Sequence, residues 1–434
     1  MILQKTKHII LVNILFICFG VLLSTCESTS PKERNLELAL LEASCTEAWL
    51  TIKVEKLHSL TEVIVIINTE DKRIFEIENS DTVLCIDSLK PATDYNVTLE
   101  IEGTKSRNIS FATLATTNNN FTFEKYYLGG ETSCYINDVA IIDENNIWAV
   151  GDIQVREENG EFSSPYGLTK WNGSEWNLEY VKYCHYPSNT ARPGKLKAIF
   201  ALDKNNIFVA SSSQLLKWNN SNWIEKAQFA DSYEFDGQIN AIWGNATDNI
   251  YCVGNNGAIY HYYGTGKKKL PKVTDLDIQD IWGDYDELTG EWEILAIASD
   301  RYQNNGRKIL KIEGDEVTEQ LTDGLPWSLK GIWFKTNRKK IICGNGVYTN
   351  NNLSKDWQKE TSLPFLYKHS ISGQALNSIV LCGAYGLISY YNGEIWESIE
   401  HLEKQKYVSV DIKGNLIVAG GQHNNSACIT IGRR

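Results

Sequence analysis

The sequence predicts an all-β protein, most of which is built from one degenerate repeat. One copy reads INDVA at 136–140, NNIWAVG at 145–151 and LTKWNGSEW at 168–176. The next copy reads LKAIF at 196–200, NNIFVA at 205–210 and LLKWNNSNW at 215–223. Each copy holds four short apolar runs with turn residues between them. Copies recur about every 45 residues, which is the period of a four-stranded propeller blade.

Seven such units can be counted from the first apolar run of each. These openings lie near Ile136, Leu196, Ile239, Ile278, Leu329, His369 and Val408. Asn-Gly pairs at 172–173 and 392–393 suit the type I′ turn that joins two twisted strands. Tryptophans follow the corresponding turns, and we expect them to pack blade against blade: Trp176, Trp223, Trp357 and Trp396. The sequence therefore predicts a seven-bladed β-propeller over residues 121–434.

The last predicted blade is short of a strand, because the chain ends after three apolar runs. A spare run, FTFEKYYL, lies before the first blade at 121–128. An unpaired sheet edge invites aggregation, so the ring should close by borrowing this strand. We expect residues 121–128 to pair antiparallel with residues 428–432.

Residues 35–115 carry an alternating pattern of their own. Short apolar strands are expected at 49–54, 63–67, 73–77 and 83–86, which favours an antiparallel sandwich that folds without the propeller. The segment LKPATDYNVTL at 89–99, followed by ISFAT at 109–113, resembles the end of a fibronectin type III domain. In that family the tyrosine at the place of Tyr95 bonds backbone through its hydroxyl while its ring enters the core, and Trp49 is the candidate for the family's core tryptophan. The expected role of this domain is a spacer.

The repeat array also resembles bacterial propellers whose repeats have the form IxxIxxxxxxNIWAVGxxGxIxxWNGxxW, similar to the two-component-regulator and BNR-type repeats. This resemblance implies a ring of blades and says little about a ligand. The Asp-box of sialidase-type propellers does not occur in the sequence.

The N-terminus has the layout of a secretory signal. Lys5 and Lys7 precede an apolar run that ends in LSTC at 23–26. Leu-Ser-x-Cys resembles the lipobox of bacterial lipoproteins, which implies a signal peptide at 1–25, lipidation of Cys26 and a polar tether at 26–34. The sequence therefore predicts a bacterial envelope protein held to the membrane by its lipid anchor alone, and secretion is the alternative.

Charge and cysteine usage limit the partners. The formal net charge of −12 disfavours nucleic acid, and the short basic runs at 267–269 and 335–340 are expected to be solvated loops. Cys45 and Cys85 are the candidate disulfide, whereas Cys252, Cys343 and Cys382 read as buried residues of second strands. No metal-ligand spacing is present, and no cofactor is predicted.

The expected binding face is the one that carries the loops after the second and fourth strands of each blade, because these loops vary while the opposite turns are tight and repetitive. The candidate binding residues on it are Tyr166, His185, Tyr186, Arg192, Tyr233, Asp236, Arg301, Tyr302, Trp327, Tyr385 and His423. No catalytic motif such as GxSxG occurs, so no catalytic residue is assigned. The sequence favours a binding platform for a glycan or an envelope protein. A propeller-type glycan hydrolase and an envelope assembly factor are the alternatives.

Overall fold

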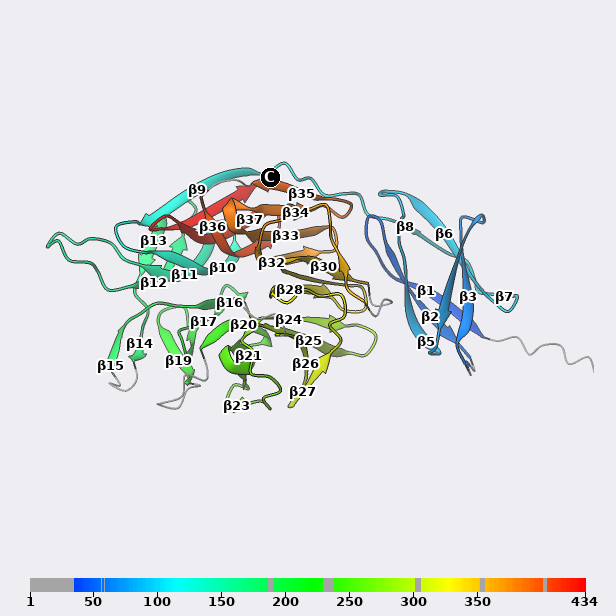
Figure 1. Ribbon diagram of the computed structural model, residues 1–434, viewed down its shortest axis with the longest axis horizontal. Coiled ribbons are helices and arrows are strands. Elements are labelled where there is room, and N and C mark those ends of the chain that lie inside the picture. The colour runs from blue at the N-terminus through cyan, green and yellow to red at the C-terminus, as the bar shows by residue number, and fades with distance from the viewer. Residues whose placement is uncertain are drawn as a thin grey trace, which may run out of the picture.

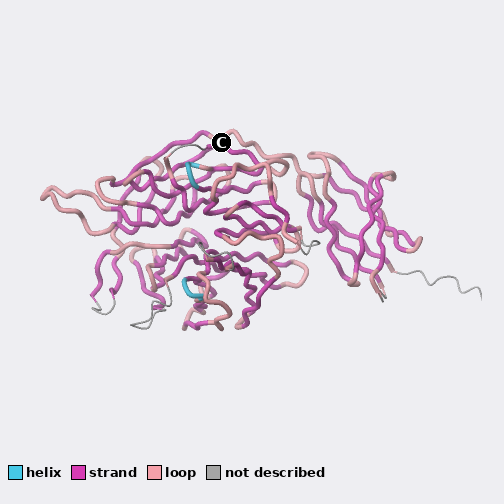
Figure 2. The backbone as a smooth tube through the Cα atoms, in the orientation of Figure 1, coloured by secondary structure: helices cyan, strands magenta, loops and turns pink. Residues whose placement is uncertain are grey.

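The computed structural model describes residues 35–434, apart from residues 56, 58, 186–189, 229–237, 301–305, 352–355 and 401–403 and the side chains of residues 185, 225–228 and 400. The regular structure is strands, interrupted only by two short 3-10 turns, η1 (Asn255–Gly257) and η2 (Ala384–Gly386), among the described residues (Figure 2). The prediction of an all-β protein is confirmed. The signal peptide, Cys26 and the tether lie outside the described residues. Within the described part of the chain, no helix is long and apolar enough to cross a membrane.

The N-terminal unit is a sandwich of two antiparallel sheets (Figure 1). One sheet has the order β1 (Leu36–Ala43), β2 (Ala48–Val54), β5 (Asp81–Ile86), and the other has the order β4 (Asp71–Ile77), β3 (Thr61–Ile67), β6 (Asp94–Ile101), β7 (Thr104–Lys105), with β8 (Ile109–Ala112) also paired to β6. Alternate side chains of both sheets share one apolar core. The ring of Tyr95 lies in this core, and its hydroxyl accepts a hydrogen bond from the Lys90 amide at 2.8 Å. The predicted backbone bond of Tyr95 is confirmed.

The rest of the described chain forms seven four-stranded antiparallel sheets, which we call blades 1 to 7 in chain order. Blades 1 to 3 are β10 (Tyr135–Asp143), β11 (Asn146–Ile153), β12 (Tyr166–Trp171), β13 (Trp176–Glu179); β16 (Ala198–Asp203), β17 (Asn206–Ala210), β18 (Gln214–Trp218), β19 (Trp223–Gln228); and β20 (Ile239–Ala246), β21 (Asn249–Gly254), β22 (Ile259–Tyr262), β23 (Lys267–Lys269). Blades 4 to 6 are β24 (Ile278–Asp286), β25 (Glu291–Ser299), β26 (Arg307–Glu313), β27 (Glu316–Gln320); β28 (Leu329–Lys335), β29 (Lys339–Gly344), β30 (Gly346–Asn350), β31 (Gln358–Lys359); and β32 (Lys368–Ala375), β33 (Ser378–Gly383), β34 (Ile388–Tyr391), β35 (Trp396–Glu400). A separate hairpin of β14 (Lys182–His185) and β15 (Thr190–Pro193) lies between blades 1 and 2.

Blade 7 closes the ring with a strand from the other end of the array. Its own strands are β36 (Lys406–Lys413), β37 (Leu416–His423) and β38 (Ser426–Arg433), and the fourth is β9 (Thr122–Gly129). β9 pairs antiparallel with β38 over its whole length, from Thr122 opposite Arg433 to Gly129 opposite Ser426. The first strands of successive blades contact one another, and β36 contacts β10. The predicted closure by residues 121–128 is therefore confirmed.

Aromatic residues join neighbouring blades, as the sequence predicted. Trp223 of blade 2 lies edge-on to Trp148 of blade 1, and Trp176 contacts Tyr126 of the borrowed strand. Trp357 is buried in an apolar cluster that spans blades 4 and 5. The cysteines at 252, 343 and 382 are buried in second strands, again as predicted.

The basic run at 335–340 corrects one prediction, because it is not a solvated loop. It forms the turn between β28 and β29, and the sandwich covers it. Arg338 is 3% exposed and lies 2.8 Å from a carboxylate oxygen of Glu42. Lys339 pairs with Glu47 at 2.5 Å, and the side chains are 10% and 9% exposed. The other basic run, Lys267–Lys269, is exposed as expected, but it forms the outer strand β23 of blade 3 and not a loop.

Trp49 also belongs to this contact between the two units and not to the sandwich core. Its neighbours Leu50 and Ile52 alternate with it, and those two enter the core. The fully buried Trp49 ring packs in a cluster with blade residues, and its indole nitrogen donates a hydrogen bond to the Arg338 carbonyl at 3.0 Å. The expected correspondence of Trp49 to a family core tryptophan is wrong.

The candidate disulfide is not formed, since both thiols are free. Thr46, which follows Cys45, accepts a backbone hydrogen bond from Leu89, whereas Cys85 lies opposite Trp49 of β2. The two cysteines are therefore four residues out of register. The Cys45 thiol instead donates to the carbonyl of Ala115 and packs against Gly393 of blade 6, while Cys85 faces the propeller beside Trp49. Burial raises the pKa of both thiols.

Candidate functional site

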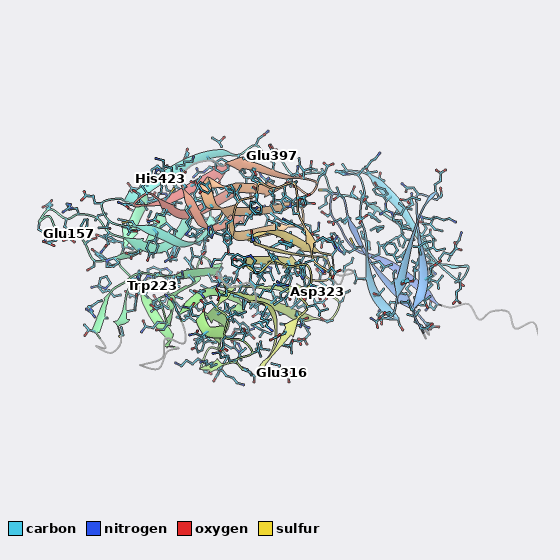
Figure 3. The ribbon with its side chains drawn as sticks, in the orientation of Figure 1. Glu157, Trp223, Glu316, Asp323, Glu397 and His423 are labelled. Carbon is cyan, nitrogen blue, oxygen red and sulfur yellow. The ribbon has the colours of Figure 1, made fainter. Side chains whose placement is uncertain are left out.

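The sandwich covers one face of the propeller and leaves the other face open. It contacts the turn after the first strand of blade 5, through Arg338, and the turn after the third strand of blade 6, through Gly393. The loops after second and fourth strands lie on the opposite side, which we call the mouth face. Glu157, in the long loop after β11, projects at the end of the propeller farthest from the sandwich (Figure 3). The tight turns therefore serve domain docking, and the mouth face is left to solvent.

A cavity of about 400 Å³ opens at the centre of the mouth face and is lined by all seven blades. Six blades contribute the residue that follows the first apolar position of their repeat, and blade 6 contributes the equivalent residue, which follows Lys368. These residues are Asn137, Lys197, Asn240, Gln279, Lys330, His369 and Val408. Lys406 adds a further cation from blade 7. The cavity volume lies within the range of small-ligand clefts.

The amides in this ring tie neighbouring blades together. Asn137 donates to the carbonyl of Leu196 at 2.8 Å, and Asn240 donates to that of Ile278 at 3.0 Å. Lys330 donates to the side-chain oxygen of Gln279 at 2.8 Å. These bonds hold the rim in place, so a ligand would meet a preformed ring.

Below the rim lie two buried aspartates of the kind that acid–base catalysis uses. Burial raises the pKa of Asp138 to about 6 and that of Asp280 to about 7, although backbone hydrogen bonds oppose the shift. Each carboxylate accepts the amide of the following residue and an amide of the next blade: Asp138 from Ile199 and Asp280 from Ile332.

Asp411 of blade 7 accepts the amide of Ile141 of blade 1 in the same way. Ser409 holds the place in blade 7 that Asp138 holds in blade 1, and its hydroxyl accepts the amide of Val139. A pattern repeated from blade to blade is what fastening requires. We therefore assign these carboxylates to holding the ring together and not to a reaction.

A second cavity of about 400 Å³ adjoins the first on the side of blades 4 to 6. It shares Gln279, Lys330 and His369 with the first cavity, and its other charged residues are Asp275, Asp277 and Asp300. The mouth therefore has a basic side and an acidic side. No group of His, Cys, Asp or Glu in the described residues could hold a metal ion.

The sequence predicted the mouth face but not the residues that line its cavities. Five of the predicted binding residues have described side chains, and none of them borders either cavity. Tyr166 stacks on Tyr180 with ring centres 4.0 Å apart, and Tyr385 is 63% exposed on the turn η2. His423 packs against the ring of Tyr127, whereas Arg192 is exposed on β15 and Trp327 is half-buried.

The remaining predicted residues lie outside the described part of the chain: Tyr186, Tyr233, Asp236, Arg301 and Tyr302, together with the side chain of His185. The signal that could have found the ring is simple. Aligning the repeats on their first apolar residue brings Asn137, Lys197, Asn240, Gln279 and Lys330 into one column.

No known protein family matches the chain, and no curated protein matches it. Solved structures do resemble it. One, described as "YCF48 bound to D1 peptide", is 14% identical with a TM-score of 0.52 over 74% of this chain and 99% of that one. Another, the WD40 beta propeller domain of Doa1, is 12% identical with a TM-score of 0.51 over 73% of this chain and 98% of that one. The fold is a β-propeller. At this level of identity the likeness extends to the fold alone.

Proposed function

We propose that this chain is a binding platform of the bacterial envelope, in which a seven-bladed propeller presents its mouth face to a protein partner. A lipid on Cys26 would hold it to the membrane. The single observation that carries the proposal is the preformed, seven-sided cavity on the face that the sandwich leaves uncovered. Propeller channels with convergent polar side chains are common places for ligands.

A peptide is the partner class that we favour over a glycan. One solved structure of similar fold is described as bound to a peptide, so a protein of this fold can bind one. The rim also offers amides and lysines from different blades, which suit the carbonyl groups and charges of a peptide segment.

The sandwich, which we propose to be of fibronectin type III type, would orient the platform. The Tyr95 hydroxyl bond and the two-sheet strand order support that type. Because it docks on the covered face through buried ion pairs, it would act as a rigid mount that points the mouth away from the sandwich. This differs from a free spacer.

The test compares two tryptophan variants in peptide binding. Val408→Trp fills the cavity at the mouth, whereas Glu144→Trp places the same ring on an exposed turn of the opposite face. Peptides selected from a random library on residues 35–434 should bind the Glu144→Trp protein as they bind the parent and should lose at least tenfold in affinity for the Val408→Trp protein. Both variants must keep the parent's thermal unfolding temperature. Equal binding by both variants would exclude the mouth as the site.

A further inference from the structure

Three lysines from three different blades converge on the mouth cavity. Lys197 comes from blade 2, Lys330 from blade 5 and Lys406 from blade 7. The whole chain has a formal net charge of −12, so this concentration of cations is not a reflection of the average surface. The lining also includes Asp138 and Asp280, but the oxygens of both carboxylates accept backbone amides. A concave site in which cations gather attracts anionic ligands.

Lys197 shows that this crowding has a cost. Among the described residues, its ammonium group makes no hydrogen bond or ion pair. Burial lowers the pKa of Lys197; Asp138 opposes the shift, whereas Lys195 and Lys406 add to it by repulsion. A desolvated ammonium group that faces a cavity beside other lysines is stabilised when an anion enters.

The buried carboxylates beneath the lysines are already engaged by the backbone. One oxygen of Asp138 and one of Asp280 accept the amide of the following residue, and the other oxygen of each accepts an amide of the next blade. An anion that enters from the mouth would therefore give the Lys197 ammonium group a partner that the ring itself does not provide.

We propose that the cavity bounded by Lys197, Lys330 and Lys406 binds a carboxylate of a peptide, either at its C-terminus or on an acidic side chain. This proposal rests on the peptide-binding function proposed above. The adjoining cavity contains Asp275, Asp277 and Asp300, so the rest of the peptide is neutral or basic where it crosses blades 4 to 6.

The test uses four rhodamine-labelled tetrapeptides and fluorescence anisotropy. The sequences are Ala-Ala-Ala-Glu and Ala-Ala-Ala-Gln, each with a free and an amidated C-terminus, so the two sources of carboxylate are separated. We expect the fully amidated glutamine peptide to bind at least tenfold more weakly than the glutamate acid, because a charge-assisted hydrogen bond commonly changes affinity by about that factor. The weaker of the two single-carboxylate peptides identifies the source that is not used. Binding should also weaken as salt is raised.

A matched pair of triple variants tests the residues. Lys197→Gln with Lys330→Gln and Lys406→Gln should weaken binding of the glutamate acid at least a hundredfold. The control replaces Lys267, Lys268 and Lys269, which lie exposed on the outer strand of blade 3, by glutamine. It removes the same charge and should leave binding unchanged. If the triple mouth variant unfolds at a lower temperature, single Lys330→Gln and Lys330→Arg proteins replace it, and only the arginine variant should retain binding.

The outcomes separate the two proposals. Equal binding of all four peptides, with loss in Val408→Trp, would leave the platform and overturn the carboxylate site. Equal binding by parent and Val408→Trp would overturn both. Binding of N-acetylneuraminic acid in the absence of any peptide binding would replace the peptide by an acidic glycan and also overturn the proposal.

Discussion

Replacing Glu47 by glutamine should weaken the attachment of the sandwich to the propeller. The Glu47 carboxylate lies 2.5 Å from the ammonium group of Lys339 and accepts a hydrogen bond from the side-chain amide of Asn351 at 3.1 Å. The side chains of Glu47 and Lys339 are both almost fully shielded from water. Burial by itself lowers the pKa of Lys339, but the attraction and hydrogen bond of Glu47, together with Tyr391 and Cys85, hold the pKa above its usual value. Glu47→Gln leaves that ammonium buried without its counter-charge.

The expected cost follows from the burial of the pair. Breaking a buried ion pair by removing one partner typically costs about 3–5 kcal/mol. The matched control is Asp315→Asn, which breaks the ion pair between Lys268 and Asp315, whose side chains are 48% and 61% exposed. An exposed pair is worth about 0–1 kcal/mol.

Urea unfolding of residues 35–434 measures both costs as changes in the free energy of unfolding. Replacing both partners, as in Glu47→Leu with Lys339→Met, should recover most of the loss, because no buried charge remains. A Glu47→Gln protein that loses no more stability than Asp315→Asn would show that the docked arrangement does not hold in solution.

Four further outcomes are expected. A propeller that starts at residue 118 should be monomeric, whereas one that starts at residue 130 lacks β9, exposes the edge of β38 and should aggregate in gel filtration; equal solubility would refute the closure. Tyr95→Ala should lower the free energy of unfolding by about 3–5 kcal/mol and Tyr95→Phe by about 1 kcal/mol in urea, because only the first also removes a buried ring. A Tyr95→Ala protein as stable as the parent would be inconsistent with the fibronectin type III proposal. Burial raises the folded-state pKa of Asp280 to about 7, so the folded state binds the proton more tightly than the unfolded state does. Stability should therefore fall as pH rises from about 4 to 7, and it should fall more steeply in the parent than in Asp280→Ser. Identical slopes in the two proteins would argue against this titration. Cys26→Ala should move the protein from the detergent phase to the soluble fraction, and retention in detergent would place the anchor elsewhere.

Much of the fold could be predicted because it follows from local pattern. A four-run repeat gives the blades, and three runs at the C-terminus leave an edge that only the spare strand at 121–128 can pair. The Tyr95 bond was predictable from the resemblance of residues 89–99 to fibronectin type III domains, and it joins residues only five positions apart. The contact between the two units was not. A turn that contains Arg338 and Lys339 looks solvated until the sandwich is placed over it.

The site was predictable as a face but not as a set of residues. Loop variability pointed to the loops after second and fourth strands, and the cavity does open on that side. Its lining, however, comes from one position in each blade, so residues such as Asn240 and Lys330 lie far apart in sequence and meet only when the ring closes. Lys197 looks unremarkable in the sequence, because the cation that crowds it, Lys406, lies in the last blade and reaches the same cavity only in the folded ring.

Photo-crosslinking in isolated envelopes, the location proposed for this protein, is the sharpest test of binding at the mouth face. Benzoylphenylalanine placed at Val408 stands at the mouth, and at Glu144 it stands on the opposite face. We expect a defined adduct with an envelope protein from position 408, suppressed by an excess of the tetrapeptide Ala-Ala-Ala-Glu, and none from position 144. An adduct from position 144 alone, or equal adducts from both positions, would contradict the assignment of the mouth face as the binding surface.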